Sequence, residues 1–233
     1  HREKGHCDDI ELLLPPGPVN ANQFTQQVNA LNPKGKTPIS AAVLHAAEAL
    51  KYTEEAATVI LVSDGLETCD QDPCQLGQQL AQTGVDFTAH VVGFGLSQED
   101  TSKLECLASA TGGLYLSAEN ATQLNVAVST AVEALEAKSN KSGVQLQARL
   151  SADSSVLESG VRWYVRPVSS SSSEQAAVIA SHIVDATPFF ALAPGNYQVE
   201  AQYGRVNVQQ EFSIEDDTIS RVDVILNAGS ITI

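Results

Sequence analysis

The sequence predicts an α/β domain, built on a doubly wound and mostly parallel sheet, followed by an all-β sandwich. In the first half, short apolar runs rich in β-branched residues alternate with segments whose apolar residues recur at helical spacing. Such alternation with short connections is typical of a parallel sheet covered by helices. Beyond about residue 138 the apolar residues alternate with polar ones, as they do in half-buried strands. Turn residues then recur at roughly the spacing of a small β-sandwich.

The first half opens with a predicted strand at residues 10–14, which ends at a proline-rich turn. A helical pattern follows at 21–31, and a stronger one spans 38–51. Pro38 suits the first turn of that second helix, because proline lacks only an amide hydrogen that would go unpaired there. The remaining strand and helix pairs are predicted at 58–63 with 74–83, at 86–93 with 100–111, and at 114–117 with 121–137.

A polar linker at 139–143 is predicted to separate a first domain, 1–138, from a second, 144–233. Residues 228–233 read as the start of a further strand, and the chain begins without methionine. We therefore expect the sequence to be a piece of a longer protein. The strands predicted in the second domain have the sequences VQLQARLS, VRWYVRPV, AAVIASHIV, PFFALA, NYQVEAQY, VNVQQEFSI and ISRVDVIL.

The charge balance limits the classes of partner. The net charge is −15 and the isoelectric point is about 4.5. Nucleic acids and anionic membranes would repel such a surface, so we expect neither as a partner. No apolar stretch of the sequence is long enough to cross a bilayer, so no membrane insertion is expected in this segment.

The cysteines indicate the redox compartment. There are four, Cys7, Cys69, Cys74 and Cys106, all in the first half. Cys69 and Cys74 are close enough in sequence for a local disulfide, while a zinc site and reduced thiols are the alternatives. We expect at least one disulfide, and so a periplasmic, cell-surface or secreted protein, with three pairings left open.

One strand end carries the clearest functional signal. The apolar run that starts at residue 57 stops at Ser63-Asp64-Gly65, and the carboxyl ends of parallel strands are where open α/β sheets bind ligands. The segment 35–38 supplies Thr37 just before a helix. A hydroxyl and a carboxylate on two loops at one sheet edge suggest a hard-cation site. The structural alternatives are an N-cap role for Thr37 and an Asx-turn for Asp64, and Glu67 is expected to be a solvated side chain.

Several short sequence motifs, which follow one another along the first domain, give it a family resemblance. They are GKTP at 35–38, VILVSDG at 59–65, AHVVGFG at 89–95, and LA with ATGG within 107–113. Together they resemble the von Willebrand factor A domain over residues 1 to about 137. The resemblance implies a metal-ion-dependent adhesion site, usually holding Mg²⁺, in which Thr37 and Asp64 match two of the ligand positions.

The third ligand loop of that family, Asp-x-Ser-x-Ser after the first strand, is absent, and its loss looks like truncation. Only one hydroxyl and one carboxylate would remain, so we expect this chain alone to bind Mg²⁺ very weakly or not at all. Removal of the family's first strands would also leave the edge of strand 58–63 open. The second domain carries LAPGNYQV at 192–199, which is similar to prealbumin-like and carboxypeptidase-regulatory-like β-sandwiches. Such modules act as spacers or binding appendages.

These observations predict a non-enzymatic binding protein. The resemblance implies that the intact protein holds a divalent cation and recognises an acidic residue on a protein partner. A scaffolding module of a bacterial envelope protein is the first alternative, and a cation-dependent hydrolase using Asp64 is the second. The sequence contains no P-loop, dinucleotide-binding glycine motif, nucleophile elbow or His-Glu-x-x-His motif.

Overall fold

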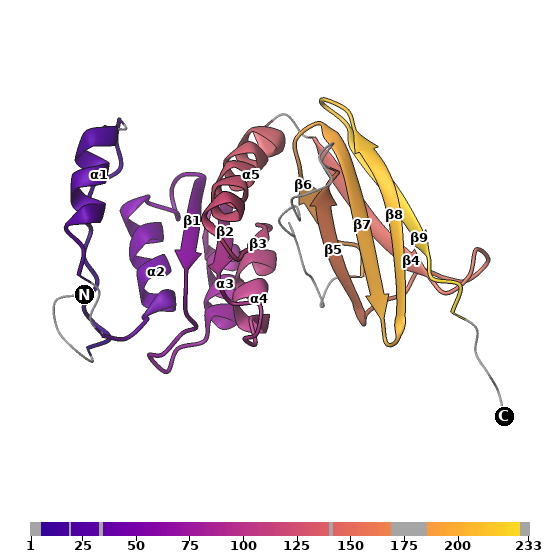
Figure 1. Ribbon diagram of the computed structural model, residues 1–233, viewed down its shortest axis with the longest axis horizontal. Helices are drawn as coiled ribbons and strands as arrows, with labels where there is room; N and C mark the ends of the chain where they lie inside the picture. The colour runs from indigo at the N-terminus through magenta and orange to yellow at the C-terminus, as the bar shows by residue number, and fades with distance from the viewer. Residues whose placement is uncertain (1–5, 19, 33–34, 140–141, 169–185, 229–233) are drawn as a thin grey trace.

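A computed structural model describes residues 6–18, 20–32, 35–139, 142–168 and 186–228, arranged as in Figure 1. The first half contains a three-stranded sheet in the order β1-β2-β3, in which both strand pairs are parallel. The predicted parallel α/β architecture is therefore confirmed for this half. The strands are β1 (Ala57–Ser63), β2 (Phe87–Phe94) and β3 (Tyr115–Ala118).

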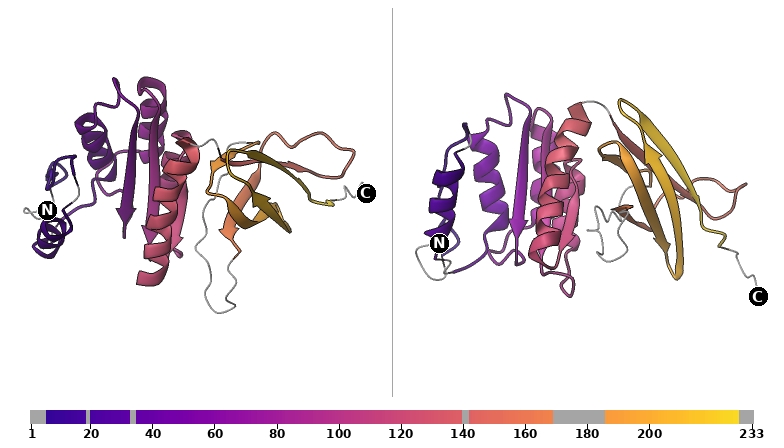
Figure 2. Two further views of the ribbon diagram at one scale, coloured as in Figure 1. Left: turned by 90° about the horizontal axis from the view of Figure 1, so that it is seen from above. Right: turned by 45° about the horizontal axis from the view of Figure 1, so that its top comes forward.

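Helices cover both faces of this sheet, as a doubly wound fold requires (Figure 2). One face packs against three helices through a core that includes Val43, Leu80, Val91 and Leu107. The other face packs against α5, whose alanines pack with Val92 and neighbouring apolar residues. The helices are α2 (Ile39–Ala49), α3 (Pro73–Thr83) and α4 (Ser102–Ala110) on the first face, and α5 (Ala121–Ser139) on the second.

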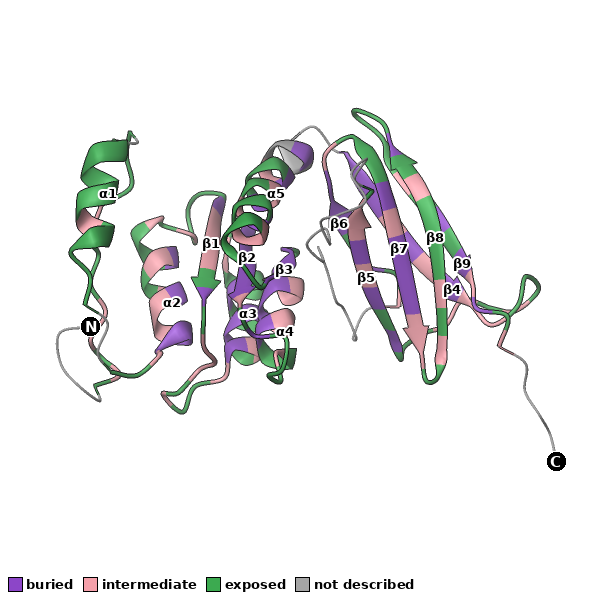
Figure 3. Cartoon of the chain, viewed as in Figure 1, coloured by how far each residue is buried: buried purple, intermediate pink, exposed green. Residues whose placement is uncertain are grey.

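The N-terminal segment does not form the predicted strand at residues 10–14. A strand needs a neighbour for its backbone groups, and β1 pairs only with β2 among the described residues. Leu12 and Leu13 stay exposed as a result. The helix α1 (Ala21–Asn29) forms, capped by the side chain of Asn20, yet buries no residue (Figure 3).

The second half forms two three-stranded sheets, which we call together the C-terminal β region. One sheet has the order β6-β4-β9 and the other β5-β7-β8. The sequence AAVIASHIV, predicted as a strand, lies outside the described residues. The strands are β4 (Gly143–Arg149), β5 (Val161–Pro167), β6 (Phe189–Ala191), β7 (Gly195–Tyr203), β8 (Val206–Ile214) and β9 (Ile219–Ile225).

Alternate residues of these strands make a common core around Trp163, which is completely buried. Leu146 and Val224 come from one sheet and Val199 from the other. The core cluster continues to the α5 side of the parallel sheet. Most pairs are antiparallel, but β4 and β9, the first and last strands of the region, pair in parallel over seven residues.

The opposite face of β7 carries a buried acidic side chain, Glu200. Burial raises the pKa of this carboxyl, but four side-chain hydrogen bonds together lower it below the usual glutamate value. Its side chain is only 8% exposed, so these bonds replace most of its hydration. The donors are Arg166 at 3.0 Å, Gln202 at 2.8 Å, Asn207 at 2.7 Å and Gln209 at 3.2 Å.

Ser142, just before β4, makes two hydrogen bonds to other parts of the fold. Ser142 is fully buried although the surrounding sequence is polar. Its amide donates to the Ala137 carbonyl at 2.8 Å, and its hydroxyl accepts from the Asp217 amide at 2.9 Å. One residue of the predicted linker thus bonds to the end of α5 and to the turn between β8 and β9.

Candidate functional site

The carboxyl end of β1 brings two predicted site loops together. Residues 63–65 leave the strand beside the segment that precedes α2. A Cβ atom placed on Gly65 would lie 3.6 Å from the Thr37 hydroxyl oxygen, so the two loops are in contact. Thr37 is half-buried and Asp64 is exposed at the rim. The structure therefore sets these two residues on adjacent loops at one edge of the sheet.

The structure shows neither an N-cap role for Thr37 nor an Asx-turn made by Asp64. The N-cap residue of α2 is Pro38, and no side chain forms a capping hydrogen bond there, so Thr37 is not the N-cap. The turn after β1 is closed by Ser63, whose hydroxyl donates to the Gly65 carbonyl at 2.8 Å. Asp64 is exposed at this turn, and the hydrogen bonds that close the turn come from Ser63 and not from Asp64.

Glu67 and Thr68 hold the two loops against each other. The Glu67 carboxylate accepts from the Ser40 amide at 2.7 Å and from the Cys69 amide at 2.8 Å. It thus serves the amino end of α2, where the helix dipole favours negative charge. The Thr37 amide donates to the Thr68 hydroxyl at 2.6 Å, and the Thr68 amide donates to the Thr37 carbonyl at 3.1 Å.

The expectation that Glu67 is a plain solvated side chain is therefore wrong. Both carboxylate oxygens are engaged, and the residue is only partly exposed. Sequence reasoning missed this role because the partner on α2 lies 27 residues away in the chain. The only signal available was the position of an acidic residue just after a strand end that faces a helix amino terminus.

Two disulfides form, Cys7–Cys69 and Cys74–Cys106, so the expectation of at least one is met. The local pair between Cys69 and Cys74 is not formed, and the described cysteines leave no free thiolate for zinc. Cys74 lies in the first turn of α3, which packs along α4, so Cys106 is its neighbour. Cys69 instead fastens the N-terminal segment to the loop that follows Asp64.

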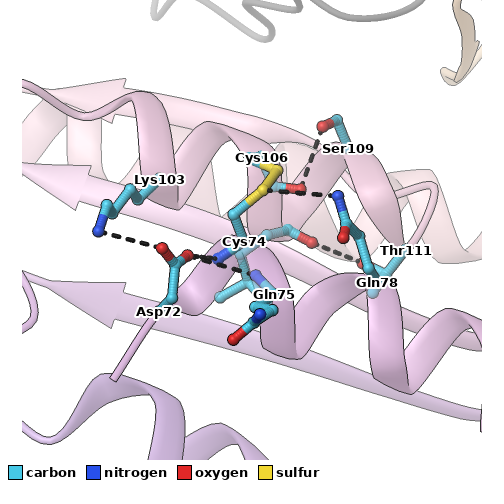
Figure 4. The surroundings of a disulfide bond; sticks show 9 residues. Asp72, Cys74, Gln75, Gln78, Lys103, Cys106, Ser109 and Thr111 are labelled. Carbon is cyan, nitrogen blue, oxygen red and sulfur yellow. Dashed lines mark hydrogen bonds and ion pairs between the residues drawn. A yellow bond between two sulfur atoms is a disulfide. The ribbon is translucent and has the colours of Figure 1, made fainter. Parts of the chain in front are cut away.

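The Cys74–Cys106 bond is flanked by an ion pair (Figure 4). Asp72 caps α3 by accepting from the amide of Cys74 at 2.9 Å and of Gln75 at 3.3 Å. Lys103 of α4 lies 3.1 Å from the same carboxylate. The hydrogen bond to Lys103, assisted by the backbone amides, holds the pKa of Asp72 below its usual value. A covalent and an ionic link thus join the same two helices.

The residues at the β1 edge meet only part of what a divalent cation needs. The hydroxyl of Thr37 and the carboxylate of Asp64 are hard oxygen donors of the kind Mg²⁺ prefers. Two such donors leave most of an octahedral shell to water. Among the described residues, no group of three or more His, Cys, Asp or Glu side chains is arranged to hold a metal. This donor set fits a cation chemically but not in number.

A groove of about 310 Å³ runs beside β1, on the edge where the described part of the chain places no neighbouring strand. Its walls are mainly apolar and come from the N-terminal segment, β1 and the start of α2. At one end it reaches Thr37 and Ser63. Its apolar lining residues include Ile10, Leu13, Leu31, Ile39, Leu61 and Val62.

Across the described ranges, no helix has both the length and the apolar character to cross a membrane. No protein-family model matches the chain. It is 28% identical over 123 residues to YwmD, an uncharacterized protein of Bacillus subtilis (strain 168), covering 52% of this chain and 55% of that protein. It is 29% identical over 114 residues to YwmC of the same organism, covering 48% and 49%. The chain spans about half the length of these curated relatives.

Two solved structures are similar at low identity. One is the ArnB paralog VWA2 from Sulfolobus acidocaldarius, with 16% identity and a TM-score of 0.36, covering 83% of this chain and 49% of that one. The other is an (S)-allantoin synthase, with 14% identity and a TM-score of 0.27, covering 88% and 74%. With likenesses this low, the chemistry of the site has to carry the functional assignment.

Proposed function

We propose that this chain is part of a non-enzymatic, protein-binding module of an exported bacterial protein. The observation that supports the proposal most directly is the contact between the loop bearing Thr37 and the loop bearing Asp64 at the carboxyl edge of β1. Glu67 and Thr68 fix that contact through three hydrogen bonds, which join the loop after β1 to the start of α2.

The proposed ligand is an acidic residue on the surface of a protein partner. In the intact protein, Thr37, Asp64 and further oxygen donors would hold a divalent cation such as Mg²⁺. The resemblance to von Willebrand factor A domains assigns those further donors to an Asp-x-Ser-x-Ser loop at the end of a neighbouring strand. Among the described residues, one edge of β1 has no strand partner, and this edge and the groove beside it would offer that strand a place.

We further propose an exported location and a spacer role for the C-terminal β region. Two disulfides form readily in a periplasmic or extracellular compartment and are rare in the cytosol. The two packed sheets and the phrase LAPGNYQV support a β-sandwich of the prealbumin-like or carboxypeptidase-regulatory-like kind. Such an appendage would hold the proposed cation site, formed by Thr37 and Asp64 at the carboxyl end of β1, at a distance from the rest of the protein.

Calorimetric titration with Mg²⁺ tests the proposal on two proteins. This chain alone should give no binding in the micromolar range, while the intact protein should bind, and Asp64→Ala in the intact protein should abolish that binding. Asp153→Asn is the control, because Asp153 is also an exposed carboxylate but lies in the C-terminal β region. Equal Mg²⁺ affinity of the Asp64→Ala and unaltered intact proteins would favour a scaffolding role without a working cation site.

A further inference from the structure

The N-terminal segment, which includes α1, contributes nothing to the buried core. None of the described residues between 6 and 32 is buried (Figure 3). The apolar side chains of α1 face solvent, with Phe24 57% and Val28 46% exposed. Apolar burial is the main favourable term in folding, whereas ordering each residue costs conformational entropy. A segment of this length without buried residues therefore needs another link to hold it against the fold.

That link is the disulfide between Cys7 and Cys69. Cys7 lies near the start of the segment, and Cys69 belongs to the loop that follows Asp64. The loop is held independently of the sulfur atoms, because Glu67 and Thr68 accept hydrogen bonds from backbone amides at the start of α2. Breaking the disulfide would therefore release the segment and leave the loop in place.

The two disulfides differ in what would keep their sulfur atoms together after reduction. Cys74 and Cys106 lie on α3 and α4, which pack against each other and bury leucines in one core. These helices would hold the two thiols close together, which favours re-formation of the bond. Cys7 has no such support, so its effective concentration at Cys69 would fall to that given by a flexible tether. Cys7–Cys69 should therefore be the more easily reduced bond.

The same segment forms one wall of the groove beside β1. Ile10 and Leu13 come from the segment, while Ile39 and Leu61 belong to the walls formed by α2 and β1. With the segment in place, Ile39 is only 3% exposed. Departure of the segment would remove one wall and open the side chains of Ile39 and Leu61, together with the edge of β1, to solvent.

We propose that Cys7–Cys69 is a reducible latch that controls access to the edge of β1. The reductant is a dithiol, such as a protein with a Cys-x-x-Cys pair. One of its thiolates attacks one sulfur of the bond and forms a mixed disulfide, and its second thiol then displaces the chain from that mixed disulfide. The dithiol becomes a disulfide, and its two protons pass to Cys7 and Cys69. The inference rests on the proposed function only because the opened edge is where the further strand of the proposed cation site would lie.

Graded reduction of the full chain tests which bond opens first. The chain is equilibrated with increasing dithiothreitol, trapped with N-ethylmaleimide and analysed by peptide mass spectrometry. Half-labelling of Cys7 and Cys69 should need at least about tenfold less dithiothreitol than half-labelling of the other two cysteines. Equal midpoints, or the reverse order, would overturn the proposal. Neither metal nor partner is present, so a failure of the proposed cation site would leave this result unchanged.

Hydroxyl-radical footprinting then tests whether the opened bond uncovers the groove. In the double variant Cys7→Ser, Cys69→Ser, labelling of Ile39 and Leu61 should rise at least about twofold above that of the oxidised chain. Labelling of Leu80, which is completely buried in the same core, should stay unchanged in both proteins. The matched variant Cys74→Ser, Cys106→Ser should keep the low labelling of Ile39 and Leu61 until dithiothreitol is added. Labelling of these two residues that stays at the oxidised level in the Cys7→Ser, Cys69→Ser protein would overturn the proposal.

Discussion

Replacing Cys7 and Cys69 by serine should release the N-terminal segment while leaving most of the first half folded. The bond closes a loop of 62 residues, for which chain entropy gives about 4.3 kcal/mol at 25 °C. That figure assumes a rigid native state. Helix α1 buries no residue, so the cut segment would also gain freedom in the native state. We therefore expect a loss of only about 1–2 kcal/mol in the free energy of unfolding.

The second disulfide provides the matched comparison. Cys74–Cys106 closes 32 residues, for which the same relation gives about 3.7 kcal/mol. Both of its ends lie in helices whose leucines are buried, so breaking it gives the native state little new freedom. Replacing Cys74 and Cys106 by serine should therefore lower the free energy of unfolding more than replacing Cys7 and Cys69 does. Chain entropy alone would give the reverse order, because the Cys7–Cys69 loop is longer.

Urea unfolding followed by circular dichroism measures both losses, and hydrogen exchange of peptides covering residues 20–32 locates the effect. In the variant lacking Cys7–Cys69, exchange in α1 should accelerate while β2 keeps its protection, because β2 is buried in the sheet centre. A loss of 4 kcal/mol or more in this variant, or unchanged exchange in α1, would refute the reasoning that the N-terminal segment is held mainly by its disulfide.

Three further predictions concern packing and protonation. Gly113→Ala should lower the free energy of unfolding by at least about 2 kcal/mol, because the new methyl group would overlap the Ala89 carbonyl oxygen. Gly112→Ala meets open space and should cost only the roughly 1 kcal/mol of a left-handed backbone conformation. Equal losses for the two variants in chemical denaturation would contradict this reasoning. Because the pKa of Glu200 is lowered in the folded state, its contribution to stability is present above the ordinary pKa of about 4.5 and is lost as the pH falls through the folded-state pKa. Glu200→Gln should therefore make the free energy of unfolding depend less on pH on the acid side. An unchanged pH dependence in this variant would count against the role of Glu200. Burial raises the pKa of Tyr115 to about 12 and also raises the pKa of Tyr197. Ultraviolet titration should therefore find tyrosine ionisation that continues to about pH 12, and loss of that last step in Tyr115→Phe, but not in Tyr197→Phe, would assign it to Tyr115.

Local pattern was enough to predict most of the secondary structure. The strand expected at 58–63 forms at 57–63, and the helix expected at 74–83 forms at 73–83, because apolar spacing and flanking breakers mark both ends. The segment 10–14 shows the limit of that reasoning. Its apolar residues have strand character, but strand formation depends on a neighbouring edge, which no local pattern reports.

The candidate site was predictable only in part, because contacts between distant segments leave no local pattern in the sequence. Thr37 and Asp64 were predicted as candidates because each stands at the end of a recognisable element, and the structure brings their loops into contact. The pairing of Cys7 with Cys69, across 62 residues, depends on where the N-terminal segment docks. The role of Glu67 depends on how two loops meet, and long-range contacts of this kind leave no periodic trace in the sequence.

The parallel pairing of β4 with β9 governs how the C-terminal β region would respond to pulling. The chain enters this region at the start of β4 and leaves it at the end of β9, so tension along the chain drags these two strands past each other lengthwise. All the rungs of a seven-residue ladder then bear the load at once, whereas a hairpin pulled from its open end breaks one rung at a time. A module connected in this way resists stretching along the chain.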